Sequence, residues 1–137
     1  MFTDSFEVRA VAPERTFWEK TMLLHEENCR EQKARRFLAR YYYDIYCLMQ
    51  AGIAEKAARD LDLFQRILEH RMFYFKHNWM DYGTIAPGTL RILPLQEHMA
   101  DWASDYRDMV KEMFYGAAPS FDEIIVAIKD FQDRFNT

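Results

Sequence analysis

Apolar side chains recur along most of this chain at spacings of three and four residues, the pattern of amphipathic helices. Pro13 suits the first turn of an opening helix, and Thr16 with Glu19 offers a capping box as an alternative start. The pattern predicts helices over residues 13–29, 34–50, 53–80 and 96–114, and a last helix after Ser120. The helix over residues 53–80 can be continuous or broken near Asp60. We therefore expect a mainly α fold, a bundle of about five helices.

Glycine and proline mark where these helices end. Gly52 follows the second helix, and Gly83 follows the third. The stretch 86–94 contains two prolines and a glycine, which predicts a Pro/Gly-rich loop with a turn and a short extended segment. Ser120 and Glu123 form a second capping box, so the last helix has a well-marked start.

Residues 5–11 alternate between polar and apolar side chains, as a half-buried β-strand does. The backbone of a strand needs a partner, and the neighbouring sequence offers none. Three partners remain open: residues 89–93, a second copy of the chain, or a preceding domain. We expect a short strand within residues 1–12, attached to a single helical domain that spans residues 1–137.

Periodicity also predicts which side chains form the core. On the third helix the apolar face consists of Phe64, Leu68, Phe75 and Trp79. On the last helix it consists of Ile124, Ile128, Phe131 and Phe135. We expect both faces to be buried.

Two ionisable residues interrupt apolar helical stripes. Lys20 lies three residues after Phe17, and Asp44 lies three residues after Tyr41. If the first two helices are antiparallel, both residues lie about twelve positions from the connecting turn, at about the same level of the hairpin. The pattern thus predicts a cation and a carboxylate that face each other at the edge of the core.

Each of these two residues has a functional and a structural interpretation. A half-buried Lys20 is a strong point charge for the phosphates of a nucleotide, but its stem can equally pack while its head reaches water. Asp44 suits a metal ligand or a general base, but it can equally pair with Arg40, one turn earlier on the same helix. Spacing leaves both alternatives open.

Other candidate chemistry is weaker. Asp60 and Asp62 form an Asp-x-Asp, but the context is helical, which indicates a helix cap rather than a metal pair. His25 is followed by glutamate but lacks the second histidine of a zinc protease motif. His70 and His77 lack a third ligand, so we expect structural roles for both and no metal site in this chain.

Composition restricts the broad class. Half of the 137 residues are hydrophobic and 29% are charged, as in a single globular domain. No apolar run approaches the ~20 residues of a membrane span, and no secretory signal opens the chain, so we expect a cytoplasmic protein with no membrane partner. The four glycines form no phosphate loop. Cys29 and Cys47 lack metal-site spacing and are expected to be reduced, packed thiols.

Four strings then suggest a family. They are Pro-Glu-Arg-Thr-Phe-Trp-Glu-Lys at residues 13–20, Arg-Tyr-Tyr-Tyr-Asp-Ile-Tyr at 40–46, Pro-Gly-Thr-Leu-Arg at 87–91 and Pro-Ser-Phe-Asp-Glu at 119–123. Together they resemble the AbiEii/AbiGii toxin family of nucleotidyltransferases, over nearly all of this chain but only in the C-terminal, helical half of the family. The resemblance implies that the family's Gly-Ser motif and Asp-x-Asp metal site belong to an N-terminal catalytic domain absent here, of which the strand within residues 1–12 is a remainder.

The same resemblance implies roles for individual residues. Lys20 matches the lysine that contacts nucleotide phosphates, and Asp44 matches a later aspartate of the active site, which makes it the candidate catalytic residue. Glu19, Arg15 and Arg40 are candidate supporting residues around them. No cofactor is expected in this chain by itself, whereas Mg²⁺ and a nucleoside triphosphate are implied for a complete enzyme.

The function implied by the resemblance is the C-terminal part of a nucleotidyltransferase toxin from a bacterial toxin-antitoxin or phage abortive-infection system. We expect it to be inactive alone, and to have as partners the missing catalytic domain, a cognate antitoxin and RNA, such as transfer RNA, as acceptor. The alternatives are a stand-alone helical binding module that partners or antagonises an intact toxin, and a plain helical domain in which Lys20 and Asp44 serve structure. An exposed strand also favours a homodimer.

Overall fold

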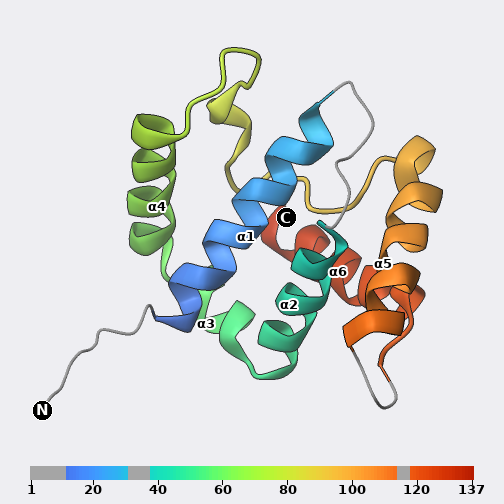
Figure 1. The fold of residues 1–137 in the computed structure, drawn as a ribbon. Helices are drawn as coiled ribbons and strands as arrows, with labels where there is room; N and C mark the ends of the chain where they lie inside the picture. The colour runs from blue at the N-terminus through green and yellow to red at the C-terminus, as the bar shows by residue number, and fades with distance from the viewer. Residues whose placement is uncertain (1–11, 31–37, 114–117) are drawn as a thin grey trace, which may run out of the picture.

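The computed structural model describes residues 12–30, 38–113 and 118–137. These residues form α1 (Pro13–Cys29), α2 (Ala39–Gln50), α3 (Ile53–Arg59), α4 (Leu61–Tyr74), α5 (Met99–Met113) and α6 (Phe121–Phe135), with short 3-10 turns at Tyr82–Thr84 and Gln96–His98 (Figure 1). The mainly α prediction is confirmed. No β-strand occurs within the described ranges, and the strand predicted over residues 5–11 lies outside them.

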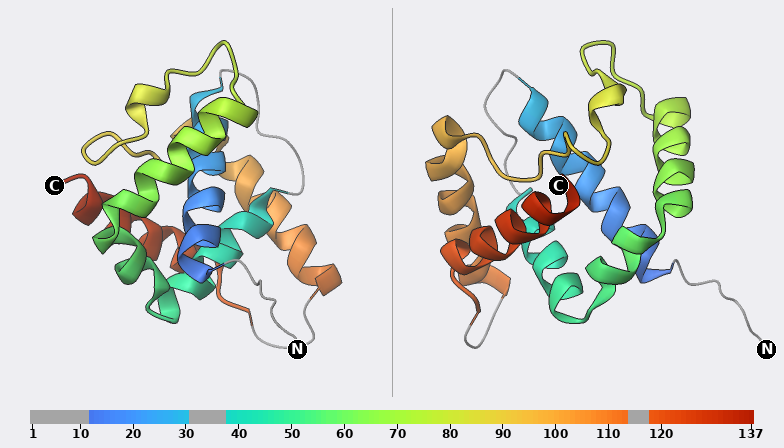
Figure 2. Two further views of the ribbon diagram at one scale, coloured as in Figure 1. Left: turned by 90° about the vertical axis from the view of Figure 1, so that its left-hand side faces the viewer. Right: turned by 180° about the vertical axis from the view of Figure 1, so that it is seen from behind.

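The central helix is α1, which packs against α2, α3 and α4. The second helix, α2, in turn packs against α3, α5 and α6. In Figure 1 and in the right-hand view of Figure 2, α4 and α5 lie on opposite sides of the α1 and α2 pair. Because α1 is covered on several sides, both of its aromatic side chains, Phe17 and Trp18, are fully buried. The indole N–H of Trp18 donates to the Ala57 carbonyl at 3.1 Å, which also ties α1 to α3.

The single helix predicted over residues 53–80 is two helices. Asp60 has non-helical backbone angles and caps α4, because its carboxylate accepts a hydrogen bond from the Leu63 N–H at 3.0 Å. The break near Asp60 and the helix-cap interpretation of the Asp-x-Asp are therefore both confirmed. This break brings the described residues to six α-helices, where about five were expected.

Only half of the apolar face predicted for residues 53–80 is buried. Phe64 and Leu68 are buried on α4, but the helix ends at Tyr74, and Phe75 and Trp79 are 55% and 50% exposed. A hydroxyl from further along the chain holds the backbone beyond the helix: Tyr82 Oη accepts from the His77 N–H at 3.0 Å and lies 3.3 Å from the Phe75 carbonyl. The chain therefore leaves the helical path before the last two apolar positions reach a covering element.

The last helix follows its prediction closely. Ser120 and Glu123 form the expected capping box, with hydrogen bonds of 3.1 and 3.0 Å. Ile124, Ile128 and Phe131 are buried, while Phe135 at the end is half-buried. The second helix is described from Ala39, so the predicted residues 34–37 lie outside the described ranges.

The Pro/Gly-rich loop is exposed at residues 87–89 and partly buried beyond them. Leu90 and Ile92 are almost completely buried, and the backbone N–H groups of residues 90–93 all donate to side chains. The acceptors, at 2.5 to 3.0 Å, are Asn136 Oδ1, His25 Nδ1 and Gln132 Oε1. None of these four N–H groups remains for a β-ladder, which weighs against residues 89–93 as the partner of an N-terminal strand.

Two smaller observations complete the fold. Cys29 is half-buried and Cys47 is exposed, so the expectation of a packed thiol is wrong for Cys47. Burial raises the pKa of the Cys29 thiol.

Within the described residues, no helix is both long enough and apolar enough to cross a membrane.

Candidate functional site

Lys20 and Asp44 meet across the α1 and α2 interface. Lys20 Nζ lies 3.0 Å from Asp44 Oδ2, and the two side chains are 24% and 26% exposed. Both residues sit on half-buried faces of their helices, beside fully buried positions such as Phe17 and Ile45. The predicted pairing of a cation and a carboxylate at the edge of the core is confirmed.

Two further groups complete this charge cluster. Lys20 Nζ lies 4.6 Å from the centre of the Tyr41 ring, within the range of a cation–π contact. Arg40 Nε lies 3.9 Å from the Asp44 carboxylate that Lys20 also contacts. The structural alternative for Asp44 is therefore present as well: one carboxylate lies between two cations, the lysine being the nearer.

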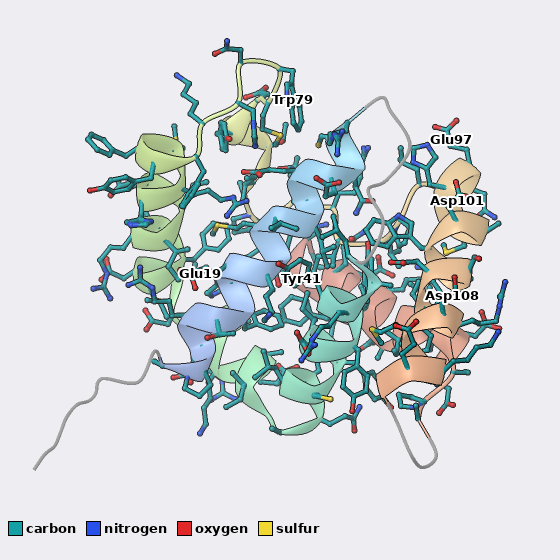
Figure 3. All side chains as sticks on the ribbon, in the orientation of Figure 1. Glu19, Tyr41, Trp79, Glu97, Asp101 and Asp108 are labelled. Atoms are coloured by element: carbon teal, nitrogen blue, oxygen red, sulfur yellow. The ribbon has the colours of Figure 1, made fainter. Side chains whose placement is uncertain are left out.

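A cavity of about 230 Å³ opens beside Lys20, between α1 and α4. Glu19 lies on the side of α1 that faces α4, and Tyr41 lies where α2 meets α1 (Figure 3). The cavity wall consists of Glu19, Lys20, Leu23, Tyr41, Ile67, His70, Arg71 and Phe75. The lysine head thus borders a hollow that has both charged and aromatic walls, the kind of surface that accepts a phosphorylated ligand.

The predicted supporting residues differ in how close they come to this cluster. Arg15 Nε pairs with Glu19 Oε2 at 3.3 Å, one turn apart on α1, and both side chains are more than two-fifths exposed. Such a surface pair contributes little to stability. Arg40 reaches Asp44 directly, and Glu19 lines the cavity, whereas Arg15 joins the site only through Glu19.

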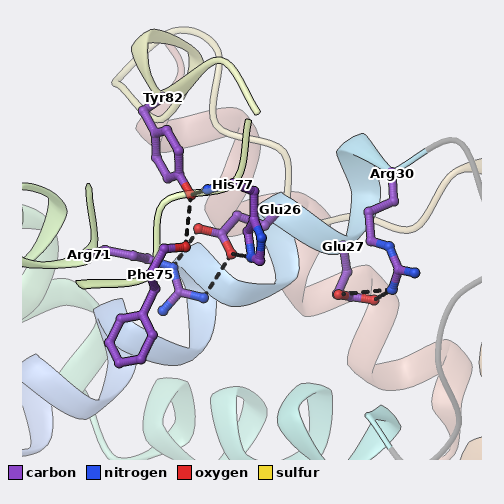
Figure 4. A network of polar contacts seen from close by, with 7 residues as sticks. All are labelled: Glu26, Glu27, Arg30, Arg71, Phe75, His77 and Tyr82. Atoms are coloured by element: carbon purple, nitrogen blue, oxygen red, sulfur yellow. Dashed lines mark hydrogen bonds and ion pairs between the residues drawn. The ribbon is translucent and has the colours of Figure 1, made fainter. Parts of the chain in front are cut away.

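A second ion pair near the cavity was missed by sequence reasoning. Arg71 on α4 donates two hydrogen bonds, of 2.6 and 2.8 Å, to the two oxygens of Glu26, whose side chain is only 4% exposed (Figure 4). His77 Nε2 lies 3.8 Å from the same carboxylate. No local pattern signals this pair, because Glu26 and Arg71 are 45 residues apart and lie on different helices.

His25 is a structural histidine, held in its neutral form. Its Nδ1 accepts a hydrogen bond from the Arg91 N–H at 2.9 Å, so the ring proton lies on Nε2, 3.0 Å from Thr84 Oγ1. Burial, and then the charge of Arg91, lower the pKa of His25 from 6.5 to about 4. This histidine is therefore unsuited to general base catalysis near neutral pH.

The described residues do not fit a magnesium site. Within them, no three side chains among His, Cys, Asp and Glu lie close enough together to hold a metal ion. Asp44 already faces Lys20 and Arg40, and Asp62 is exposed and 3.6 Å from Arg66. A carboxylate that already faces two cations is a poor ligand for a further cation.

Comparison with known proteins places the chain in a family. Residues 1–133 match the family model described as nucleotidyl transferase AbiEii toxin, type IV TA system. A comparison with curated proteins finds no match, and neither does a comparison with solved structures. The family match covers nearly the whole chain, including the helices that carry Lys20 and Asp44. This chain belongs to the AbiEii family of nucleotidyltransferase toxins of type IV toxin-antitoxin systems.

Proposed function

We propose that this chain is the helical part of a nucleotidyltransferase toxin, in which Lys20 binds the phosphates of a nucleoside triphosphate and Asp44 holds that lysine in position. The observation that carries the proposal is the 3.0 Å ion pair at the border of the cavity between α1 and α4. It places a fixed positive charge where a phosphorylated ligand has access.

The chemistry of the ammonium group supports this role for Lys20. An ammonium has three N–H donors, and one directed at Asp44 leaves two for phosphate oxygens. A quarter of the side chain is exposed, so binding a ligand does not require the helices to separate. In this partly dry position the attraction to a triphosphate is stronger than at an open surface.

Asp44 acts on the nucleotide through Lys20 in this proposal. Its carboxylate fixes the ammonium in place, which is a positioning role within the active site. Arg40 adds a second positive charge, 3.9 Å from the same carboxylate. Glu19 borders the cavity and Arg15 pairs with Glu19, and we assign these two residues only the orientation of the cavity's rim.

The metal-dependent part of the reaction must come from elsewhere. Phosphoryl and nucleotidyl transfer use metal ions to neutralise the triphosphate, and the described residues hold no such site. We propose that a nucleotidyltransferase core with a Gly-Ser motif and a metal-binding Asp-x-Asp supplies it, and that this chain alone transfers no nucleotide. Membership of a toxin-antitoxin family implies a cognate antitoxin, and we propose RNA as the acceptor.

The test is nucleotide transfer by this chain joined to a family nucleotidyltransferase core, measured with labelled triphosphate and total RNA. Lys20→Ala should lower the rate by about 100-fold or more, the scale of losing one preorganised charge in an active site. Asp44→Asn should raise KM for the triphosphate more than it lowers kcat, since the lysine stays charged but loses its anchor.

A matched control is Lys56→Ala, which removes an exposed lysine from α3, away from the cavity. It should leave nucleotide transfer unchanged. Full transfer by the Lys20→Ala protein would contradict the proposal.

A further inference from the structure

An aromatic ring takes part in holding Lys20 at the candidate site. Tyr41 precedes Asp44 by three residues on α2, so the helical period places both side chains on the same face, toward α1 (Figure 3). Lys20 Nζ lies 4.6 Å from the centre of the Tyr41 ring and 3.0 Å from Asp44 Oδ2. Two neighbouring side chains of α2 thus contact the same ammonium group of α1.

The backbone that carries Tyr41 is fixed by contacts outside this charge cluster. The Tyr41 N–H donates to the Leu38 carbonyl at 2.9 Å, in the first turn of α2. The Ala39 N–H donates to the Asp105 carboxylate on α5 at 3.0 Å, and the next residue along, Tyr42, is fully buried. The start of α2 is therefore anchored in the core, and the ring of Tyr41 offers the lysine a fixed surface.

A ring holds a cation without cancelling its charge. The quadrupole of the ring attracts an ammonium group, although the ring itself has no net charge. Lys20, Arg40 and Asp44 together carry one positive charge, and a second carboxylate in place of the ring would remove it. Since phosphates are attracted to net positive charge, an aromatic partner fixes the lysine and leaves the site able to bind an anion.

The ring also lies where a ligand of Lys20 has access. Tyr41 is half-buried and shares with Lys20 the wall of the 230 Å³ cavity between α1 and α4. A lysine head on a flexible four-carbon stem has many rotamers that reach water. A surface that restricts those rotamers lowers the entropy lost when the ammonium group binds a phosphate.

We propose that Tyr41 is a positioning residue of the nucleotide site, whose ring holds the Lys20 ammonium group beside the cavity so that its remaining N–H donors meet the phosphates. This role belongs to the ring and needs no hydroxyl group. The inference deepens the proposed function and rests on it for its effect on nucleotide binding. The contact between ring and ammonium can be measured without any nucleotide.

The contact is tested by ¹³C NMR of the 137-residue chain after reductive methylation of its lysines, which leaves every amine charged. The methyl signal of Lys20, identified by its absence from a Lys20→Arg variant, should lie upfield of the other lysine signals because a ring faces it. It should stay upfield in Tyr41→Phe and return to the position of the exposed lysines in Tyr41→Leu. A Lys20 signal among the exposed lysines in the unaltered chain would overturn the proposal.

The effect on nucleotide binding is tested in the same core-fused enzyme as the proposed function. Tyr41→Leu should raise KM for the triphosphate by about threefold to thirtyfold, the scale of one cation–π contact, and change kcat by less than about twofold. Tyr41→Phe should keep KM within about twofold of the unaltered value, because the ring remains. The matched control is Tyr46→Leu, which alters a half-buried tyrosine of α2 outside the cavity wall and should leave KM unchanged.

The conservative variant separates the ring from the hydroxyl, and it keeps the proposal open to contradiction even if Tyr41→Leu does not fold. An equal rise in KM for Tyr41→Phe and Tyr41→Leu would assign the role to the hydroxyl group and overturn the proposal, as would an unchanged KM for Tyr41→Leu. Full transfer by Lys20→Ala contradicts the proposed function itself. An ordinary NMR position of the Lys20 signal contradicts only the role of Tyr41, so the two failures are distinguishable.

Discussion

Two ion pairs connect α1 to the helices on either side of it. Glu26 pairs with Arg71 on α4, where both carboxylate oxygens are satisfied and the glutamate side chain is 4% exposed. Lys20 pairs with Asp44 on α2 through a single 3.0 Å contact, and both side chains are about a quarter exposed. Both cations line the same cavity.

The difference shows which of the two cations is available to a ligand. A guanidinium locked by two hydrogen bonds into a buried carboxylate releases it only at the cost of leaving that charge unpaired. An ammonium with one ionic contact and partial access to solvent keeps donors for another anion. The first pair therefore holds α4 against α1, whereas the ammonium of the second pair remains partly open to solvent.

The largest loss of stability should come from breaking the buried ion pair between Glu26 and Arg71. Arg71→Ala leaves the Glu26 carboxylate in a dry position with no cation, and should lower the free energy of unfolding by about 3–5 kcal/mol and Tm by about 10 °C or more. Arg66→Ala, which breaks an exposed pair with Asp62 on the same helix, should cost at most about 0.5 kcal/mol. Equal stability losses for the two variants in urea denaturation would show that the buried pair is no anchor.

Acid should lower the free energy of unfolding by about 3 kcal/mol through His25, the residue next to Glu26 on α1. The pKa of His25 is about 4 in the fold and about 6.5 in an ordinary environment. Between these values the unfolded chain takes up a proton that the folded chain refuses, so stability is full above pH 6.5 and falls as pH decreases toward 4, by about 3 kcal/mol.

The measurement is urea denaturation at pH 7, 5.5 and 4. His25→Gln, whatever its own stability, should show a shallower decline over this range. His98→Gln, which alters a histidine outside the loop contacts of His25, should keep the original slope. A His25→Gln chain with an unchanged slope would assign the acid response to other groups.

The smallest effect on stability should come from breaking the open pair. Lys20→Ala and Asp44→Ala should each lower the free energy of unfolding by less than about 1 kcal/mol, because solvent compensates partly exposed charges. Differential scanning calorimetry should show a shift of a few degrees at most. A loss as large as that of Arg71→Ala would mean that Lys20 and Asp44 serve structure, and would remove the contrast between the two pairs.

Prediction from sequence succeeded where regular elements alone decide the outcome. The meeting of Lys20 and Asp44 follows from two helices of known rise and a short connection between them, so local periodicity was enough. The start of α6 followed from its capping box for the same reason. Each of these features depends on neighbours within one helix or one hairpin.

Prediction failed where the outcome depends on which faces are covered. Phe75 and Trp79 carry the right period for a core face, yet they are exposed, because α4 ends before them. Cys47 is exposed although it lies within α2. Periodicity identifies the residues that share a face, but it does not identify the face that another element will cover.

The sequence by itself determined a mainly helical chain, its family, and the pair of charges at the centre of the candidate site, since each is written in local spacing or in short motifs. Only the tertiary structure decided the buried pair of Glu26 with Arg71 and the side chains that hold the backbone of residues 90–93. It also decided the exposure of the aromatic side chains at the end of α4 and just beyond it. These features join positions far apart in the chain or depend on packing. Their energies come from removing water, which no local pattern records.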